Sequence, residues 1–225
     1  MDAKKRSSID ERRAIASRDS SATYQKRRKE ITDAAVQVFN RLGYKGASLS
    51  AVASELGVDR ATLYYYFSSK EQLFDEIVRT VLETNDALAR RIANSSADPA
   101  RKLRELIVAL MVSYAEHYPL LFIYIREDLA HVSDRRSGWS QHMRGLNRSI
   151  EDSLIAIIEQ GHRSGSLREI GSARTIAYGI LGMLNWTHRW YKPERSESAE
   201  EIGQAFAEFA LAGLDATETS TAKPL

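Results

Sequence analysis

The chain of 225 residues contains no cysteine. This absence excludes a disulfide framework and Cys-based zinc sites, and it fits a reducing compartment such as the cytoplasm. Proline and glycine are also scarce, with 4 and 12 residues, whereas 43% of the residues are hydrophobic. Together these numbers favour a folded, mostly helical protein over a disordered one.

Features of membrane proteins, exported proteins and enzymes are missing as well. No apolar run approaches the ~18 residues of a membrane-spanning helix, and the polar N-terminus is unlike a secretory signal peptide. There is no Gly-x-Ser-x-Gly motif, phosphate-binding loop or dinucleotide fingerprint. No metal-ligand spacing joins the histidines, which are His117, His131, His142, His162 and His188. We therefore expect no enzymatic activity, no metal, no cofactor and no membrane association.

The net charge is only +2, but it is unevenly distributed. Residues 1–70 carry 14 Lys and Arg against 8 Asp and Glu, a net of +6, while residues 71–225 carry 18 against 22, a net of −4. A basic front on an acidic body indicates a polyanionic partner for the front, although a solvated basic tail is the alternative. We expect disordered tails at residues 1–22 and 217–225.

Apolar residues recur with helical spacing along nearly the whole chain, and strand signals are almost absent. Helix punctuation is also present. Gly43 and Gly57 predict helix ends, while Ser48, Asp98 followed by proline, and Ser172 predict helix starts. The helix that begins after Ser172 is expected to reach about Tyr191. The sequence therefore predicts an all-α fold of about nine helices.

Residues 49–68 match the pattern of a helix-turn-helix. Ala53 is small where two such helices cross closely, and Gly57, four residues later, stands where the turn requires a positive φ. Val58 then fills the turn. The second helix, starting at Asp59, is held across the first with its N-terminal end exposed, as a helix that enters the major groove must be.

A run of aromatic residues follows in this second helix. Leu63 and Phe67 stand four residues apart and are predicted to face inward, while Tyr66 beside them is expected to pack partly on the next helix. The open side would carry a cation, a hydroxyl and two phenols, which suit base edges and phosphates: Arg60, Thr62, Tyr64 and Tyr65. The alternative is that the tyrosines only fill a small core.

The stretch "GYKGASLSAVASELGVDRATLYYYFSSKEQLF" resembles the DNA-binding domain of TetR-type transcriptional regulators. The similarity covers residues 24–80 and includes the Gly-Val turn, the Thr-Leu-Tyr-x-Tyr-Phe motif and the following Ser-Lys-Glu. The resemblance implies a helix-turn-helix domain at residues 23–70 and a ligand-binding and dimerisation domain at residues 71–216.

The resemblance also implies roles for individual residues. Contacts with the DNA backbone are expected from Lys45, Ser48, Tyr64, Tyr66 and Lys70. Base edges would be faced by Ser50, Arg60, Ala61, Thr62 and Tyr65. Members of the family are homodimers that bind palindromic double-stranded DNA, mostly as repressors, and are released by a small ligand in the C-terminal domain. The implied location is the bacterial cytoplasm, at the nucleoid.

The last two helices carry small residues at helical spacing, with large apolar groups between them. Small residues let helices approach closely, and paired helices of this kind form the dimer interface in the family. The candidate dimer residues are Gly179, Gly182, Gly203, Phe206, Ala207 and Ala210. Packing within one chain is the alternative.

Polar and aromatic residues interrupt the apolar stripes of the C-terminal domain, which is typical of a ligand pocket between helices. The candidate ligand-binding residues are Tyr114, His117, Phe122, Tyr124, Arg126, Trp139, Met143, Tyr178, Asn185, Trp186 and Arg189. The segment "NWTHRWYKPE" is similar to the end of the eighth helix in a TetR subgroup that regulates fatty-acid and steroid catabolism in response to acyl-CoA thioesters.

The sequence thus predicts a ligand-released repressor of catabolic or lipid and steroid genes, with an acyl-CoA effector. Arg189 would bind phosphate, whereas its alternative role is to compensate the helix dipole or to pair with Glu194. One alternative function is an efflux or stress regulator that responds to a hydrophobic molecule without CoA. Another is an architectural DNA-binding protein without a ligand, which the large helical body disfavours.

Overall fold

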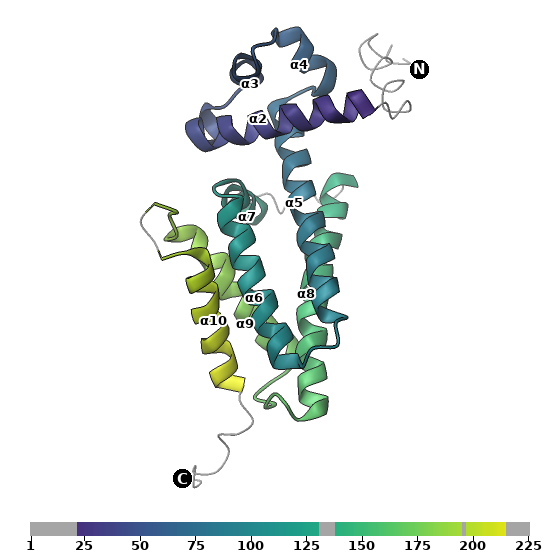
Figure 1. Cartoon of the computed structure of the whole chain (residues 1–225), viewed down its shortest axis with the longest axis vertical. Coiled ribbons are helices and arrows are strands. Elements are labelled where there is room, and N and C mark those ends of the chain that lie inside the picture. Colours follow the sequence, from purple (N-terminus) through teal and green to yellow (C-terminus); the bar gives the residue numbers. More distant parts are fainter. Residues whose placement is uncertain (1–21, 131–137, 195–196, 215–225) are drawn as a thin grey trace. The chain divides into compact units, whose positions relative to one another are not determined.

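The computed structural model describes residues 22–130, 138–194 and 197–214, with the backbone alone described at 126–130 and 138–140. These residues form nine α-helices, one short 3-10 helix and no strand (Figure 1). The predicted all-α class is confirmed. The helices are α2 (Ala22–Gly46), α3 (Leu49–Leu56), α4 (Arg60–Tyr66), α5 (Lys70–Ala93), α6 (Pro99–Glu116), α7 (Leu120–Ala130), α8 (Gly138–Ser164), α9 (Ala173–Trp186), the 3-10 helix η1 (Thr187–Arg189) and α10 (Ala199–Leu214).

The chain divides into two compact units, residues 1–79 and residues 80–225. This division falls inside α5, whereas the sequence had suggested residue 70, where α5 begins. The predicted tails at residues 1–22 and 217–225 lie outside the described residues, except for Ala22.

The first unit packs α2, α3, α4 and the beginning of α5 around a small apolar core. Ile31 and Phe39 of α2, Leu63 of α4, and Phe67 and Leu73 on either side of the α5 start are all fully buried. The backbone of α2 leaves helical geometry at Gly43, which has a φ of 68°. The regular part of α2 therefore ends at Gly43, as predicted.

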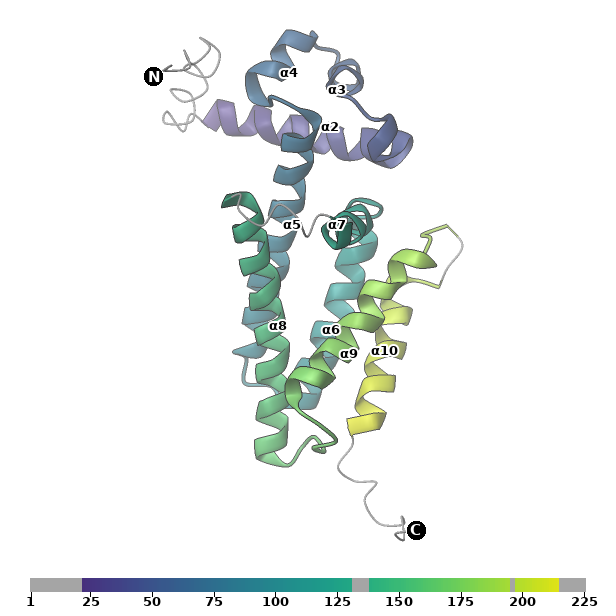
Figure 2. The same ribbon diagram turned by 180° about the vertical axis from the view of Figure 1, so that it is seen from behind.

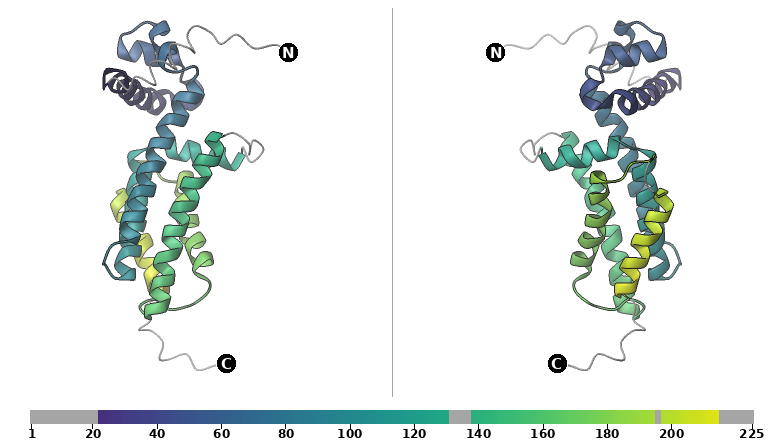
Figure 3. Two further views of the ribbon diagram at one scale, coloured as in Figure 1. Left: turned by 90° about the vertical axis from the view of Figure 1, so that its right-hand side faces the viewer. Right: turned by 90° about the vertical axis from the view of Figure 1, so that its left-hand side faces the viewer.

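In the second unit, α6 packs against both α8 and α10 (Figure 2). Asp98 caps α6 by accepting a hydrogen bond from the Arg101 amide at 3.0 Å, and Ser172 caps α9 through the Thr175 amide at 3.1 Å. Within this unit, α9 lies on the opposite side from the Thr80–Ala93 part of α5 (Figure 3).

The end of α9 differs from the sequence prediction, which extended this helix to about Tyr191. The α-helix ends at Trp186 and tightens into η1. Two side chains account for this change: the Thr187 hydroxyl donates to the Leu184 carbonyl at 2.6 Å, and His188 Nδ1 lies 2.6 Å from the carbonyl oxygen of Asn185. These contacts satisfy the last carbonyls locally, as is common where a helix narrows at its end.

In the part of the chain that the structure describes, no helix has the length and apolar character needed to cross a membrane.

Candidate DNA interface and ligand pocket

Hydrogen bonds between capping side chains and the backbone set the geometry of the helix-turn-helix. Ser48 Oγ accepts from the Ala51 amide at 3.1 Å and starts α3, and Gly57 ends that helix in the left-handed region with a φ of 65°. Asp59 then accepts from the Thr62 amide at 2.8 Å and starts α4. This backbone hydrogen bond, with one from the Thr62 hydroxyl, lowers the pKa of Asp59. The second helix of the motif is therefore fixed at its N-terminus by an ionised cap.

The open face of α4 carries a preorganised pair of side chains. Arg60 Nη2 donates to the Tyr64 hydroxyl at 2.7 Å, and the guanidinium carbon lies 5.1 Å from the Tyr64 ring centroid. Arg60 is exposed, as is Ala61, and Thr62 is half-buried. Because an arginine has five N–H donors in a planar fork, donors remain for a base edge or a phosphate.

Tyr65 and Tyr66 are both half-buried against Tyr24 at the start of α2. The Tyr24 ring lies 5.0 Å from Tyr66 and 6.2 Å from Tyr65 between centroids. Tyr66 was expected to pack partly on the helix following α4, and the ring contact that the structure shows is with α2. The reason is that α2 begins at Ala22, well before the first apolar residue of its stripe, Ile31, so its first turn covers this end of α4. Burial raises the pKa of Tyr66.

Arg28 connects α2 to the end of α4 and the beginning of α5, a role that the sequence pattern did not indicate. Its Nε donates to Glu76 at 3.1 Å, a second guanidinium nitrogen also pairs with Glu76, and Nη1 donates to the Tyr66 carbonyl at 3.0 Å. The guanidinium carbon lies 4.3 Å from the Phe67 ring centroid. One side chain thus joins α2, the end of α4 and the beginning of α5. Its position in a stretch of consecutive basic residues gave no signal for such a role.

The other predicted DNA contacts lie on α3 and at the ends of neighbouring helices. Lys45, Ser48 and Ser50 are exposed. Lys70 is half-buried because its Nζ donates to the Tyr44 carbonyl at 2.9 Å and lies 4.6 Å from the Tyr44 ring centroid. The first unit therefore brings the predicted residues together on α3, α4 and the adjoining turns, and their individual contacts with DNA stay predictions.

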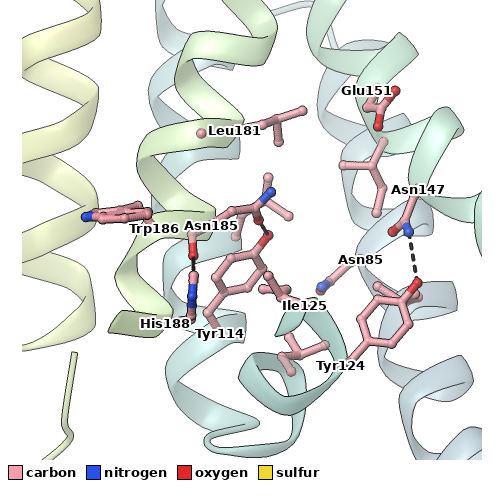
Figure 4. A pocket seen from close by; sticks show the side chains of 15 residues that line it. Asn85, Tyr114, Tyr124, Ile125, Asn147, Glu151, Leu181, Asn185, Trp186 and His188 are labelled. Atoms are coloured by element: carbon pink, nitrogen blue, oxygen red, sulfur yellow. Dashed lines mark hydrogen bonds between the residues drawn. The ribbon is translucent and has the colours of Figure 1, made fainter. Parts of the chain in front are cut away.

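The second unit contains a cavity of about 370 Å³ (Figure 4). This volume is within the usual range for small-molecule sites. The residues that line it are Leu82, Asn85, Leu110, Tyr114, Leu121, Tyr124, Ile125, Asn147, Ile150, Glu151, Leu181, Gly182, Asn185, Trp186 and His188.

Most of the polar groups in this pocket are paired with one another. The Tyr114 hydroxyl donates to Asn185 Oδ1 at 2.8 Å, and Asn147 Nδ2 donates to the Tyr124 hydroxyl at 2.9 Å (Figure 4). Burial, reinforced by the neighbouring Tyr124, raises the pKa of Tyr114. Tyr114 therefore stays a neutral phenol and a hydrogen-bond donor at any physiological pH.

Four of the predicted ligand residues line the cavity: Tyr114, Tyr124, Asn185 and Trp186. The side chains of two others, Arg126 and Trp139, lie outside the described residues. The remaining five, which the structure places elsewhere, are His117, Phe122, Met143, Tyr178 and Arg189.

These five positions have separate structural explanations. His117 caps α6, with its amide donating to the Ser113 carbonyl at 3.1 Å. Phe122 packs between aromatic rings, 5.4 Å from Tyr118 and 6.1 Å from Tyr191 between centroids. Met143 is buried outside the cavity wall. Tyr178 is 46% exposed, and its hydroxyl donates to Glu151 of α8 at 3.4 Å. Helical spacing identifies residues on one face but does not say which face borders the cavity.

Arg189 lies beside the pocket lining without being part of it. Its guanidinium carbon is 4.9 Å from the centroid of the Trp186 ring, and Trp186 is 58% exposed. Within the described residues no ion pair joins Arg189 to Glu194, whereas its position in the last turn of η1 suits compensation of the helix dipole.

The outer face of α9 and α10 is partly apolar and partly bare. Gly182, one of the predicted dimer residues, lines the cavity instead, whereas a Cβ added at Gly179 would meet nothing within 4 Å. Phe209 is 72% exposed and Tyr178 is 46% exposed. Phe206 and Ala210 are half-buried on α10. These residues remain available for a helix-to-helix contact between two protomers.

Two of the predicted dimer residues, however, face the interior of the protomer. Gly203 is buried against α6, where an added Cβ would lie 2.9 Å from the Val108 Cα, and Ala207 is fully buried. The expectation for these two positions is corrected: their small size serves the close approach of α10 to α6. The same physical requirement, close contact between helices, applies within a chain and between chains.

Among the described residues, no group of three or more His, Asp or Glu side chains is placed to hold a metal ion.

Comparison with known proteins gives consistent matches over both units. Residues 96–214 match the model of the tetracyclin repressor-like C-terminal domain, and residues 31–77 match that of the bacterial regulatory proteins of the tetR family. The transcriptional repressor KstR2 of Mycobacterium tuberculosis is 26% identical over 189 residues, which are 84% of this chain and 92% of that protein.

Solved structures agree with the architecture. The TetR family regulator PfmR of Thermus thermophilus has a TM-score of 0.71 at 29% identity, covering 82% of this chain and 98% of its own. The regulator FadR of Bacillus subtilis, solved in complex with stearoyl-CoA, has a TM-score of 0.63 at 22% identity, covering 82% of this chain and 97% of its own. The chain belongs to the TetR family of bacterial transcriptional regulators.

Proposed function

We propose that the protein is a repressor of catabolic genes that binds a palindromic operator as a homodimer and is released by an acyl-CoA thioester. The observation that carries this proposal is the presence, in one chain, of a recognition helix with Arg60 exposed at its N-terminal end and of a cavity of about 370 Å³ in the second unit. The relatives support both parts, since KstR2 is named a repressor and FadR was solved with stearoyl-CoA.

The DNA side of the proposal depends on the Arg60 and Tyr64 pair at the exposed end of α4. A guanidinium that is already oriented by a neighbouring phenol loses less conformational freedom when it binds. A bidentate contact from Arg60 to the O6 and N7 atoms of guanine would read one base pair in each half-site.

We predict that Arg60→Ala weakens operator binding by about 1–3 kcal/mol and relaxes preference at one base pair per half-site. Sequencing of bound genomic fragments should return a few palindromes for the wild-type protein, and competition with single-base operator variants should locate the relaxed position. Arg91→Ala removes an exposed cation from the second unit and should change neither property. Equal weakening on all DNA sequences would identify Arg60 as a phosphate contact instead.

The effector side depends on how polar groups are distributed around the pocket. The described lining contains one carboxylate, Glu151, and neither lysine nor arginine. The phosphates of CoA are therefore poorly suited to the cavity itself, which would hold the acyl portion. The exposed Trp186 and the Arg189 that stacks on it offer an aromatic face and a guanidinium at the pocket edge, where adenine and phosphate could bind.

Titration calorimetry with a series of acyl-CoA thioesters beside the matching free acids tests this arrangement. We predict that Arg189→Ala weakens the thioesters about tenfold or more, since charge-assisted hydrogen bonds contribute about 1.5–3 kcal/mol, and leaves the free acids nearly unchanged. Arg174→Ala is the control, because Arg174 is an exposed arginine in the first turn of α9, the helix that precedes η1. If a hydrophobic molecule without CoA releases the operator and no thioester binds, the protein regulates a different response, such as efflux or stress.

A further inference from the structure

Asn85 of α5 is the most deeply buried polar side chain in the described wall of the pocket, with 2% of its surface exposed. Its Oδ1 accepts a hydrogen bond from Ser113 Oγ on α6 at 2.8 Å. This bond fixes the plane of the amide. The Nδ2 atom consequently points towards the middle of the cavity, between Tyr114 and Tyr124 (Figure 4).

Nδ2 of Asn85 has no hydrogen-bond acceptor among the residues that the structure describes. Because Asn85 lines the cavity, this donor is accessible to a group that enters it. Asn147 differs, because its Nδ2 donates to Tyr124. Asn185 also accepts through its Oδ1, from Tyr114, but it is only half-buried, whereas Asn85 is 2% exposed. Asn85 is therefore a donor held ready for a group that enters the cavity.

The surroundings restrict the charge of that group. The apolar part of the described wall includes Leu82, Leu110 and Ile150, and its single carboxylate is Glu151. An anion placed against Asn85 would lie in an apolar wall with a nearby like charge and without a described cation, which is costly. A neutral oxygen acceptor meets the needs of the amide without that cost.

We infer that Asn85 selects effectors that carry a neutral carbonyl oxygen on the apolar body buried in the pocket. The inference rests on the proposed ligand-regulated function and deepens it, because it defines the end of the effector opposite the exposed Trp186. Recognition of such an effector requires one hydrogen bond, from Asn85 Nδ2 to the carbonyl oxygen of the effector. The hydrogen bond between Ser113 and Asn85 stays in place.

Three probes of similar shape test the inference on the wild-type protein: cyclododecanone, methylenecyclododecane and cyclododecanecarboxylate. Binding is followed by tryptophan fluorescence, to which Trp186 in the wall should respond. The ketone should bind about tenfold more tightly than the olefin, because one hydrogen bond to a waiting donor is worth about 1.4 kcal/mol. The carboxylate should bind more weakly than the ketone.

Asn85→Leu keeps the approximate shape and removes the donor, so the ketone should lose its tenfold preference over the olefin. Asn94→Leu, at an exposed asparagine beyond the end of α5, should keep that preference. Equal binding of ketone and olefin by the wild-type protein overturns the inference even if Asn85→Leu does not fold. Tighter binding of the carboxylate, or no binding of any probe, overturns it too, while thioester-dependent release of the operator would still support the proposed function.

Discussion

Gly203→Ala should destabilise the protein by about 2 kcal/mol, although alanine is a better helix former than glycine. The new Cβ would lie 2.9 Å from the Cα of Val108 and 3.3 Å from the Cβ of Met111. The nearer atom belongs to the backbone of α6, so it cannot move away by a change of rotamer. Either α10 shifts outward along its whole contact with α6, or the clash remains, and both outcomes cost free energy.

The matched control is Gly145→Ala, in the N-terminal third of α8, where an added Cβ meets nothing within 4 Å. This substitution should stabilise the protein by about 0.5–1 kcal/mol through helix propensity alone. Urea unfolding of both variants at one protein concentration measures the difference. If Gly203→Ala is as stable as Gly145→Ala, the close approach of α10 to α6 is not what requires a glycine at this position.

Much of the fold could be predicted because its boundaries are set by local chemistry. Ser48, Asp98 and Ser172 each accept a hydrogen bond from the amide three residues later, and Gly57 adopts the left-handed conformation expected of it. Such caps depend on a few neighbouring residues, so they are visible in the sequence. The inward positions of Leu63 and Phe67 followed from helical spacing in the same way.

The partners of each helix could not be predicted, because periodicity defines a face and not what covers it. Tyr66 was expected to pack on α5 but lies on Tyr24 of α2. Gly203 and Ala207 were expected between protomers but lie inside one. In each case the residue type was interpreted correctly, as an aromatic needing cover or a small residue permitting close contact.

The pocket was only partly predictable for a related reason. The residues of its wall come from α5, α6, α7, α8, α9 and η1. Tyr114, Tyr124 and Trp186 could be predicted because they interrupt apolar stripes. Asn85 gave the same kind of signal, a single amide between Leu82 and Ala89 on a buried stripe, and was overlooked. Its significance comes from Ser113, twenty-eight positions away, which fixes the amide.

The correction at Gly203 changes which residues can join two protomers. With Gly182 in the cavity wall, the predicted dimer residues still available on α9 and α10 are Gly179 and the half-buried Phe206 and Ala210. The exposed side chains of Tyr178 and Phe209 lie on the same two helices. In a two-fold symmetric dimer each of these residues contributes twice, because the same surface is used by both copies. A large apolar side chain that is 72% exposed, as Phe209 is, suits the packing of one protomer against the other.

Phe209→Glu should therefore convert the protein to a monomer and weaken operator binding about 100-fold or more. Each dimer would bury two unpaired carboxylates at the interface, which disfavours dimerisation. A monomer binds only one half-site, so it loses the gain in affinity that comes from two linked DNA-binding domains. Sedimentation measures the oligomeric state, and titration with a palindrome and an isolated half-site measures affinity; the half-site affinity should hardly change. Ile170→Glu is the control, because Ile170 is 57% exposed but lies on the connection between α8 and α9, so this variant should remain a dimer. A Phe209→Glu variant that sediments as a dimer would place the protomer contact on a different surface.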